Sequence, residues 1–369
     1  MRQETCDSGS MMISPDIERG ARNLLGACAQ AQSGERLIIV EEDPALGYYD
    51  DGLGEIIAEC ARRAGLQVER RQTPFSPEID AMPAHLEDAL RTSDHILFLA
   101  RVGDQLRFTA MPNDAKPIVS YVLDRKALAS PFAGACYGDL FDLKHALDRL
   151  VGVARHIRIT CPLGTDFAGS VERQEAQSSD VTVKRFPISV FSPVPCQNFS
   201  GKVAVMHCLA GTGSRYYEPY GVKLAEPVFA KVEGNRVVDW DGPGDAVRRV
   251  TAHYEFVAGR FGIERDFVHS WHAGIHPGCV YEGSAFENLE RWSGSAFGNP
   301  RLLHFHTCGA FAPGEICWNV VDPTIAIDDV PVWENGRLYP ERFPEGRDIL
   351  ARNAELAALF ANPQNEIGL

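Results

Sequence analysis

Five of the eleven histidines of this chain fall between residues 269 and 306, in a stretch that also holds glycines, prolines, tryptophans and a few carboxylates. Histidine is the commonest metal ligand and the side chain that titrates nearest neutrality. Such a density in a short segment predicts a metal-centred active site. The histidines concerned are His269, His272, His276, His304 and His306.

The pair His304 and His306 is separated by one residue, within a run from Arg301 that is typical of a strand. Alternate residues of a strand project from the same face, so both imidazoles should point the same way. An isolated pair of this kind is more often structural and hydrogen-bonded. The second histidine cluster upstream favours metal binding, and we expect both side chains to be metal ligands.

The upstream cluster contains Gly274 and Pro277, which disfavour a regular helix. We therefore expect its histidines in a loop at the mouth of a sheet. Not all three can bind a metal beside the downstream pair, and we expect His269 to be the third ligand. His272 and His276 are then candidates for substrate binding or proton transfer, with ordinary loop structure as the alternative.

The acidic residue of the site is harder to assign. Glu315 precedes an apolar strand and could point back to the histidine pair, so we expect it to be a catalytic residue. Asp322 lies further along, and Asp328 with Asp329 fits an ordinary turn. Three cysteines also lie in this region, where packing is favoured over metal binding: Cys279, Cys308 and Cys317.

The elements that must position these residues indicate an α/β fold of two domains, as expected for 369 residues. Residues 1–15 resemble a loose leader, and in residues 16–160 short apolar runs alternate with amphipathic helices. That alternation predicts a doubly wound parallel sheet. Residues 161–369 are expected to form an α+β catalytic domain that holds the metal site.

Individual segments support this reading. The sequence predicts a strand at Arg36–Val40, a helix at Asp51–Ala64, mostly β structure at Val181–Asp241, a helix at Asp245–Phe261 and a C-terminal helix from about Gly346 to Ala361.

Several classes of function are disfavoured. No glycine-rich phosphate-binding motif follows a predicted strand, and Asp43, Asp50 and Asp51 would repel a pyrophosphate. The formal net charge of −14 argues against nucleic-acid binding. No apolar run is long enough to cross a membrane, and the cysteines are scattered, so a cytoplasmic protein with reduced thiols is expected.

The order of several short segments resembles the aminopeptidase T type metallopeptidases and their relative, 2,5-dihydroxypyridine 5,6-dioxygenase, a non-haem iron enzyme. The segments are Ile157–Asp166, Phe186–Val190 running to Gly201, Gly274–Pro277 and Thr324–Asp328. The resemblance spans most of residues 35–340. It implies an α/β N-terminal domain, a metal site and a dimer.

Departures from the family pattern bear on the metal. Val190 stands where the peptidases place a metal-binding glutamate, and Trp318-Asn319-Val320 replaces a His-x-Asp pair of both relatives. The resemblance implies that ligation moved to His304 and His306, which fall near a histidine position of the peptidases. His269 falls within one residue of the upstream ligand of the dioxygenase.

Together these observations favour a mononuclear non-haem Fe(II) dioxygenase that opens a small hydroxylated or amino-substituted aromatic or N-heteroaromatic ring, with dioxygen as co-substrate. Trp271, Trp318 and Tyr281 could wall a flat pocket. The alternative is a hydrolase of aminopeptidase or amidase type, with zinc or another divalent ion and Glu315 as general base. A closed four-ligand site would instead indicate a metal-binding protein without catalysis.

Overall fold

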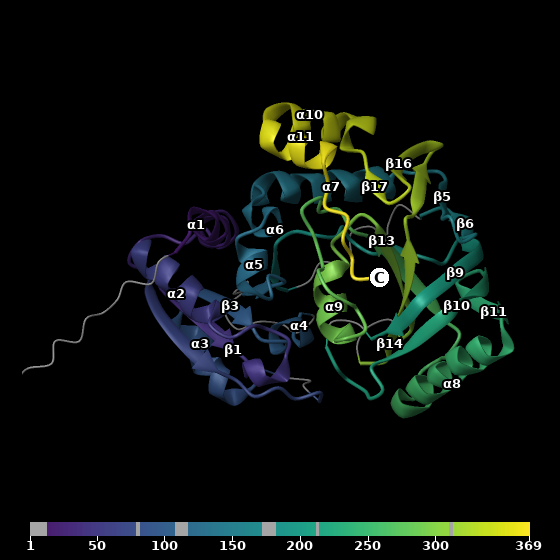
Figure 1. Cartoon of the computed structure of the whole chain (residues 1–369), viewed down its shortest axis with the longest axis horizontal. Coiled ribbons are helices and arrows are strands. Elements are labelled where there is room, and N and C mark those ends of the chain that lie inside the picture. The colour runs from purple at the N-terminus through teal and green to yellow at the C-terminus, as the bar shows by residue number, and fades with distance from the viewer. Residues whose placement is uncertain (1–12, 79–81, 108–116, 172–181, 212–213, 310–312) are drawn as a thin grey trace, which may run out of the picture.

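The computed structural model describes residues 13–78, 82–107, 117–171, 182–211, 214–309 and 313–369. Most of the expected leader, residues 1–12, lies outside this range, and the first helix begins at Pro15. The described chain contains a parallel sheet with its helices and a larger antiparallel sheet, which lie on opposite sides of the view in Figure 1.

The parallel sheet has the strand order β2-β1-β3-β4-β7. Its strands are β1 (Arg36–Glu41), β2 (Gln67–Gln72), β3 (His95–Leu99), β4 (Ile118–Ser120) and β7 (Lys184–Phe186). The central strand β1 is a continuous apolar run that is buried from Leu37 onward. Such a run is typical of a parallel strand covered on both faces.

Helices cover both faces of this sheet. On one face α3 (Ala84–Thr92) packs Leu86 and Leu90 against Ile38 and Phe98. On the other face lie the remaining helices of this part: α1 (Pro15–Arg22), a π-helical turn (Asn23–Cys28), α2 (Leu53–Arg63), α5 (Arg125–Leu128), α6 (Pro131–Gly134) and α7 (Tyr137–Gly152). The short α4 (Val102–Gln105) follows β3. This arrangement confirms the expected parallel sheet with helices on both sides.

The antiparallel sheet contains twelve strands among the described residues, with the principal order β17-β16-β15-β5-β6-β9-β14-β13-β12-β8, and β10 and β11 added beside β9. The strands are β5 (Ile157–Thr160), β6 (Asp166–Gly169), β8 (Val194–Pro195), β9 (Phe199–Ala210), β10 (Gly221–Glu233), β11 (Arg236–Asp241), β12 (Val268–Ala273), β13 (Leu302–Cys308), β14 (Glu315–Val321), β15 (Thr324–Ile327), β16 (Val330–Glu334) and β17 (Arg337–Leu338). Helices α8 (Gly244–Phe261), α9 (Leu289–Ala296), α10 (Pro344–Arg352) and α11 (Ala354–Ala361) accompany it.

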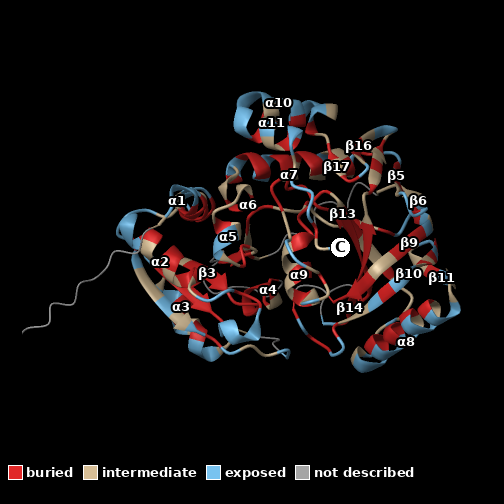
Figure 2. Ribbon diagram, viewed as in Figure 1, coloured by how far each residue is buried: buried red, intermediate tan, exposed pale blue. Residues whose placement is uncertain are grey.

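The innermost part of this sheet is β13, every residue of which is buried (Figure 2). It pairs with β12 on one side and with β14 on the other. Leu303 and Phe305 belong to the apolar core, so the alternating His304 and His306 face the opposite side of the sheet. The sheet therefore has one face devoted to packing and another that carries polar side chains.

Most of the expected elements are confirmed, and one is corrected. Helices α2 and α8 lie within one or two residues of their expected bounds. The C-terminal helix is two helices instead of one, because Asn353 leaves helical geometry and its side chain accepts a hydrogen bond from Leu356 N.

The chain passes between the two sheets more than once. The expected domain boundary after residue 160 falls between β5 and β6, which pair with each other in the antiparallel sheet. Strand β7 then returns to the parallel sheet, where it pairs with β4. Among the described residues, no helix is both long and apolar enough to span a membrane.

Candidate metal centre and cavity

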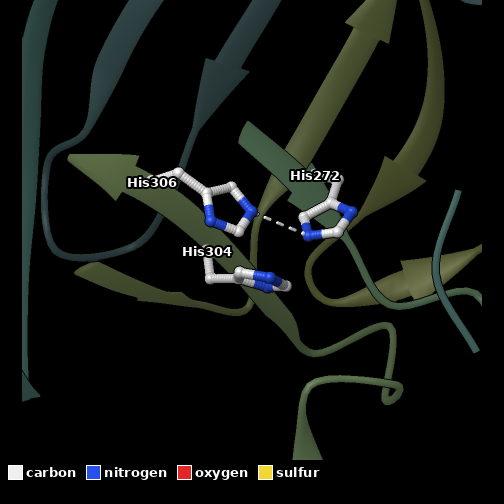
Figure 3. Close-up of side chains that lie close together, drawn as sticks. All are labelled: His272, His304 and His306. Carbon is white, nitrogen blue, oxygen red and sulfur yellow. Dashed lines mark hydrogen bonds between the residues drawn. The ribbon is translucent and has the colours of Figure 1, made fainter. Parts of the chain in front are cut away.

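Three buried histidines meet on the polar face of the antiparallel sheet: His272 from β12, and His304 and His306 from β13 (Figure 3). One ring nitrogen from each lies within 4.8 Å of the others. The register explains the meeting, because His272 stands directly opposite His304 and Ser270 stands opposite His306. Within the described residues, this is the group of His, Cys, Asp and Glu side chains that could hold a metal ion.

The outer nitrogen of two of these rings is held by an acceptor. His272 Nδ1 lies 2.8 Å from the carbonyl oxygen of Phe191, which can only accept, so this nitrogen carries the proton. His306 Nδ1 makes a hydrogen bond and ion pair with Glu315 Oε1. Both rings therefore turn an unprotonated Nε2 inward when neutral, as metal-binding histidines do.

These two inward nitrogens lie 3.1 Å apart, as the dashed line in Figure 3 shows. When both are unprotonated they cannot hydrogen-bond to each other, and a metal ion, a shared proton or a water molecule would satisfy them. His304 adds a buried Nδ1 that has no hydrogen-bond partner among the described residues. The donor set thus fits a divalent metal ion bound by three imidazoles.

Burial keeps the cluster in the state that binds metal. It lowers the pKa of His272 and His304 well below the ordinary value, and the positive charge that His306 can carry acts in the same direction. Neutral imidazole is the form that ligates a metal. At neutral pH both rings are therefore available as ligands.

Glu315 is the first residue of β14, opposite Cys308 and diagonal to His306 across the β13–β14 pair. This position aims its carboxylate back at His306, as the sequence predicted, and only 3% of the residue is exposed. A carboxylate in this place orients the imidazole and raises its basicity as a ligand. Glu315 therefore contacts the cluster through His306.

The structure places the upstream histidines differently from the expectation. His269 and His272 lie in the strand β12 and not in a loop. The group that could hold a metal contains His272, which was expected to bind substrate or transfer a proton, and does not contain His269, which was expected to be a ligand. The register of β12 against β13 shifts between Val268 and Ser270, which places His269 at a bulge.

His269 and Ser270 both line the cavity in front of the cluster. The His269 ring is half-buried and packs edge-on against Phe267, with ring centroids 4.1 Å apart. Burial lowers its pKa to about 4, so it is neutral at neutral pH. His269 thus places an uncharged imidazole at the wall of the cavity, outside the metal-binding group of the described residues.

His276 is not brought to the cluster. It lies in the loop after β12, and its Nδ1 accepts a hydrogen bond from Gly278 N at 3.0 Å. Its ring packs edge-on against Phe132, and it is not among the residues that line the cavity. The contacts of His276 are those of a residue that holds the loop.

The cavity has a volume of about 830 Å³ and reaches from the histidines to α7 and the π-helical turn. Phe191 lines it, and Phe297 stacks on His304 with ring centroids 4.2 Å apart. The aromatic residues expected to wall it do not line it: Trp271, Trp318 and Tyr281. Trp271 and Trp318 are fully buried in the core, because they face the other side of their strands.

The remaining acidic candidates lie outside the cluster. Asp328 and Asp329 form the turn between β15 and β16, both with positive φ, as the sequence predicted. Asp322 pairs with Arg301 at 2.6 Å. Cys279, Cys308 and Cys317 are buried cysteines that do not belong to the metal-binding group of the described chain.

Comparison with known proteins gives the fold a context. No family model matches the sequence, and no curated protein matches it. Among solved structures, 2,5-dihydroxypyridine dioxygenase from Pseudomonas putida KT2440 aligns with a TM-score of 0.58 and 12% identity, over 91% of this chain and 99% of that one. AmpT from Thermus thermophilus aligns with a TM-score of 0.52 and 10% identity, over 88% of this chain and 98% of that one.

This chain shares their fold. The segment order seen in the sequence therefore reflects a real structural likeness to both proteins. At these identities the likeness is one of architecture, and the chemistry has to be argued from the site.

Proposed function

We propose that this protein is a mononuclear non-haem Fe(II) dioxygenase that opens the ring of a small hydroxylated or amino-substituted aromatic or N-heteroaromatic compound. The observation that carries the proposal is the set of three buried imidazoles, two of which are held so that an unprotonated Nε2 faces inward. Three protein ligands leave coordination positions free on the side of the cavity, as a catalytic site requires. The fold shared with a dioxygenase adds support.

The ligand set differs by one residue from the one expected from the sequence. That expectation had His269 beside His304 and His306, whereas here His272 joins the pair and the carboxylate of Glu315 binds a histidine. The ligands are then neutral, and a divalent ion would keep its full charge. A bound Fe(II) would lower the pKa of a ring hydroxyl and supply the redox chemistry with dioxygen.

The other side chains divide the remaining work. Glu315 and the Phe191 carbonyl fix the direction of two imidazoles. Phe191 and Phe297 offer aromatic surface to a flat ring. His269 is neutral and only partly buried at the cavity wall, so it passes the proton that a ring hydroxyl releases on binding to solvent and does not keep it.

The second candidate is a metal-dependent hydrolase of aminopeptidase or amidase type. Three histidines with an open position are also a zinc site that activates water, and AmpT shares the fold. Against a two-metal peptidase site, Val190 lines the cavity where the peptidase pattern has a glutamate. The one carboxylate that lines the cavity beside the cluster in the described chain, Glu315, already binds His306.

For partners, we propose an aromatic small molecule and dioxygen as co-substrates, a homodimeric assembly and a cytoplasmic location, with no role for nucleic acid. The net charge of −14 supports the exclusion of nucleic acid. The dimer follows the family resemblance.

The experiment that tests the function begins with anaerobic metal analysis of the purified protein. It continues with reconstitution by Fe(II) or Zn(II) and oxygen-electrode assays on dihydroxypyridines and aminophenols. Iron-dependent oxygen uptake with loss of the ring absorbance is the expected result. Tightly held zinc, no oxygen uptake and release of amine from peptide or amide substrates would replace the oxygenase with the hydrolase.

A further inference from the structure

Arg185 in β7 has a buried guanidinium nitrogen with nothing to bind. Its Nε is inaccessible to solvent and has no hydrogen-bond partner among the described residues. Arg185 as a whole is only partly buried, so this nitrogen is the part of the guanidinium that is removed from water. A buried N–H without an acceptor costs free energy, which an acceptor on a bound molecule would recover.

The side chain faces the cavity of the metal centre. Arg185 lines that cavity together with the three histidines. Of its strand neighbours, Phe186 lies in the apolar core, and Lys184, which also lines the cavity, donates its Nζ to the carbonyl oxygen of Cys28 at 3.1 Å. Burial is the main cause of the low pKa of His272 and His304, and the positive charge of Arg185 adds a smaller contribution in the same direction, so the guanidinium lies within electrostatic reach of the cluster.

The carboxylates around it are already engaged. Asp104 accepts hydrogen bonds from Tyr121 Oη at 2.9 Å and from Arg107 Nη1 at 2.7 Å. Asp148 forms an ion pair with Lys144 at 2.8 Å, and Glu315 forms a hydrogen bond with His306. The other cations near the centre thus have internal partners, whereas the described chain gives Arg185 none.

The shape of the guanidinium decides which anion fits it. The charged side chains that line the cavity comprise five arginines and lysines and four aspartates and glutamates, counting histidines as neutral, and Asp148 adds a fifth carboxylate as the partner of Lys144. The cavity is therefore close to neutral, and Arg185 is a cation in it for which the described chain supplies no acceptor. A carboxylate supplies one negative charge and two oxygens that match the planar fork of a guanidinium, whereas a phosphate monoester brings up to two charges.

We propose that Arg185 binds a carboxylate on the ring substrate, so that the substrates of this protein are aromatic carboxylic acids. The ring-opening part of this statement rests on the proposed function. The binding of an aromatic carboxylate by Arg185 does not, because it depends only on the cavity and its charges.

The first test is a binding measurement on the metal-free full chain. Benzoate and benzamide have the same shape and differ in charge, and calorimetry gives the affinity of each. We expect benzoate to bind at least about tenfold more tightly, the size of a hydrogen bond to a charged group. Equal affinities in the wild-type chain would overturn the proposal without the need for any variant.

Variants then assign the preference to one residue. Arg185→Gln should bring the two affinities close together, and Arg185→Lys should keep part of the preference, because it retains the charge and loses the fork. Arg158→Gln, which removes a cation paired with Asp166 on an exposed strand, should leave the preference unchanged. If folded Arg185→Gln still prefers benzoate, then Arg185 is not the binding group.

Phenyl phosphate separates the two anion chemistries. A stronger preference for phenyl phosphate that disappears in Arg185→Gln would replace the carboxylate by a phosphate. Failure of the proposed oxygenase is seen independently, as an absence of iron-dependent oxygen uptake in a chain that still discriminates benzoate from benzamide.

Discussion

The two sheets bury polar groups in different ways. At the carboxyl end of β1 and β3, Arg101 pairs with Glu42 at 3.0 Å and with Glu290 of α9 at 2.8 Å, under the ring of Phe75. On the antiparallel sheet, the three histidines turn ring nitrogens toward one another beside a cavity, and His304 Nδ1 has no hydrogen-bond partner in the described chain. We call the first cluster closed, because its charged groups pair with one another and leave Arg101 Nη2 without a hydrogen bond, and the second cluster open, because it lines the cavity.

This difference between the two clusters indicates which part of the molecule can bind a ligand. In open α/β sheets, ligands usually bind at the carboxyl ends of the strands where the strand order reverses, which here is beside β1. The ion pairs of Arg101 fill that place and tie α9 to the parallel sheet. The polar groups left to meet a ligand lie instead around the cavity, on the antiparallel sheet and at Arg185 of the edge strand β7.

The largest effect should come from breaking the open cluster. His306→Ala is expected to abolish stoichiometric metal binding, because it removes one of three ligands, and to leave the parallel sheet folded. Metal content of the gel-filtered protein and circular dichroism measure the two properties. His276→Ala is the matched control and should retain metal; stoichiometric metal in His306→Ala would remove His306 from the site.

A second prediction tests which upstream histidine is the third metal ligand. His272→Ala should lose the metal, whereas His269→Ala should keep it and lose turnover, because His269 lies at the bulge beside the cluster. Metal analysis of the two variants side by side decides between them. The opposite pattern would restore His269 as the ligand.

Breaking the closed cluster should affect stability and not metal content. Arg101→Met leaves Glu42 buried without its cation and Glu290 with Arg215 alone, and removing one partner of a buried ion pair costs about 3–5 kcal/mol. Urea denaturation monitored by fluorescence gives the free energy of unfolding. A change below about 1 kcal/mol would mean that the ion pairs are replaceable by solvent.

A smaller effect is expected where the open cluster meets its supporting carboxylate. Glu315→Gln keeps the shape and a hydrogen-bond acceptor but loses the charge that orients His306. Loss of such a supporting carboxylate lowers metal affinity about 10- to 100-fold. Competition with a chelator measures the affinity, and an unchanged value would show that His306 needs no charged partner.

The smallest effect concerns a histidine outside both clusters. Burial lowers the pKa of His253 from 6.5 to about 4, so the unfolded chain binds a proton there before the folded chain does. Stability is therefore lost as pH falls from 6.5 toward 4, by about 1 kcal/mol per pH unit. In metal-free protein, His253→Phe should make the decline of the melting temperature over this range shallower; an unchanged slope would show that His253 does not contribute.

Much of the fold follows from local pattern. The apolar run of β1 and the helical spacing of apolar residues in α2 and α8 are visible in the sequence and predict these elements. The common face of His304 and His306 follows from strand alternation alone. The break at Asn353 was missed, because helix periodicity continues on both sides of the capping residue.

The third ligand depends on tertiary structure and could not be read from spacing. His272 is a ligand candidate because β12 lies in register with β13, and His269 is displaced by a bulge that no local signal announces. The Phe191 carbonyl and the Phe297 ring reach the cluster through contacts distant in sequence. One signal in the sequence could have identified His272. If residues 268–273 are taken as a strand, Ser270 and His272 lie on the same face of it, two residues apart, and can face the histidine pair of the neighbouring strand.

The short segment from Arg185 to Phe191 joins the two sheets, since it begins in β7 of the parallel sheet and ends at the carbonyl that holds His272. Any sliding of one sheet over the other would displace Arg185 and pull on that carbonyl together. Recognition of a charged ring and the aim of a metal-binding imidazole are thereby coupled mechanically through seven residues of chain.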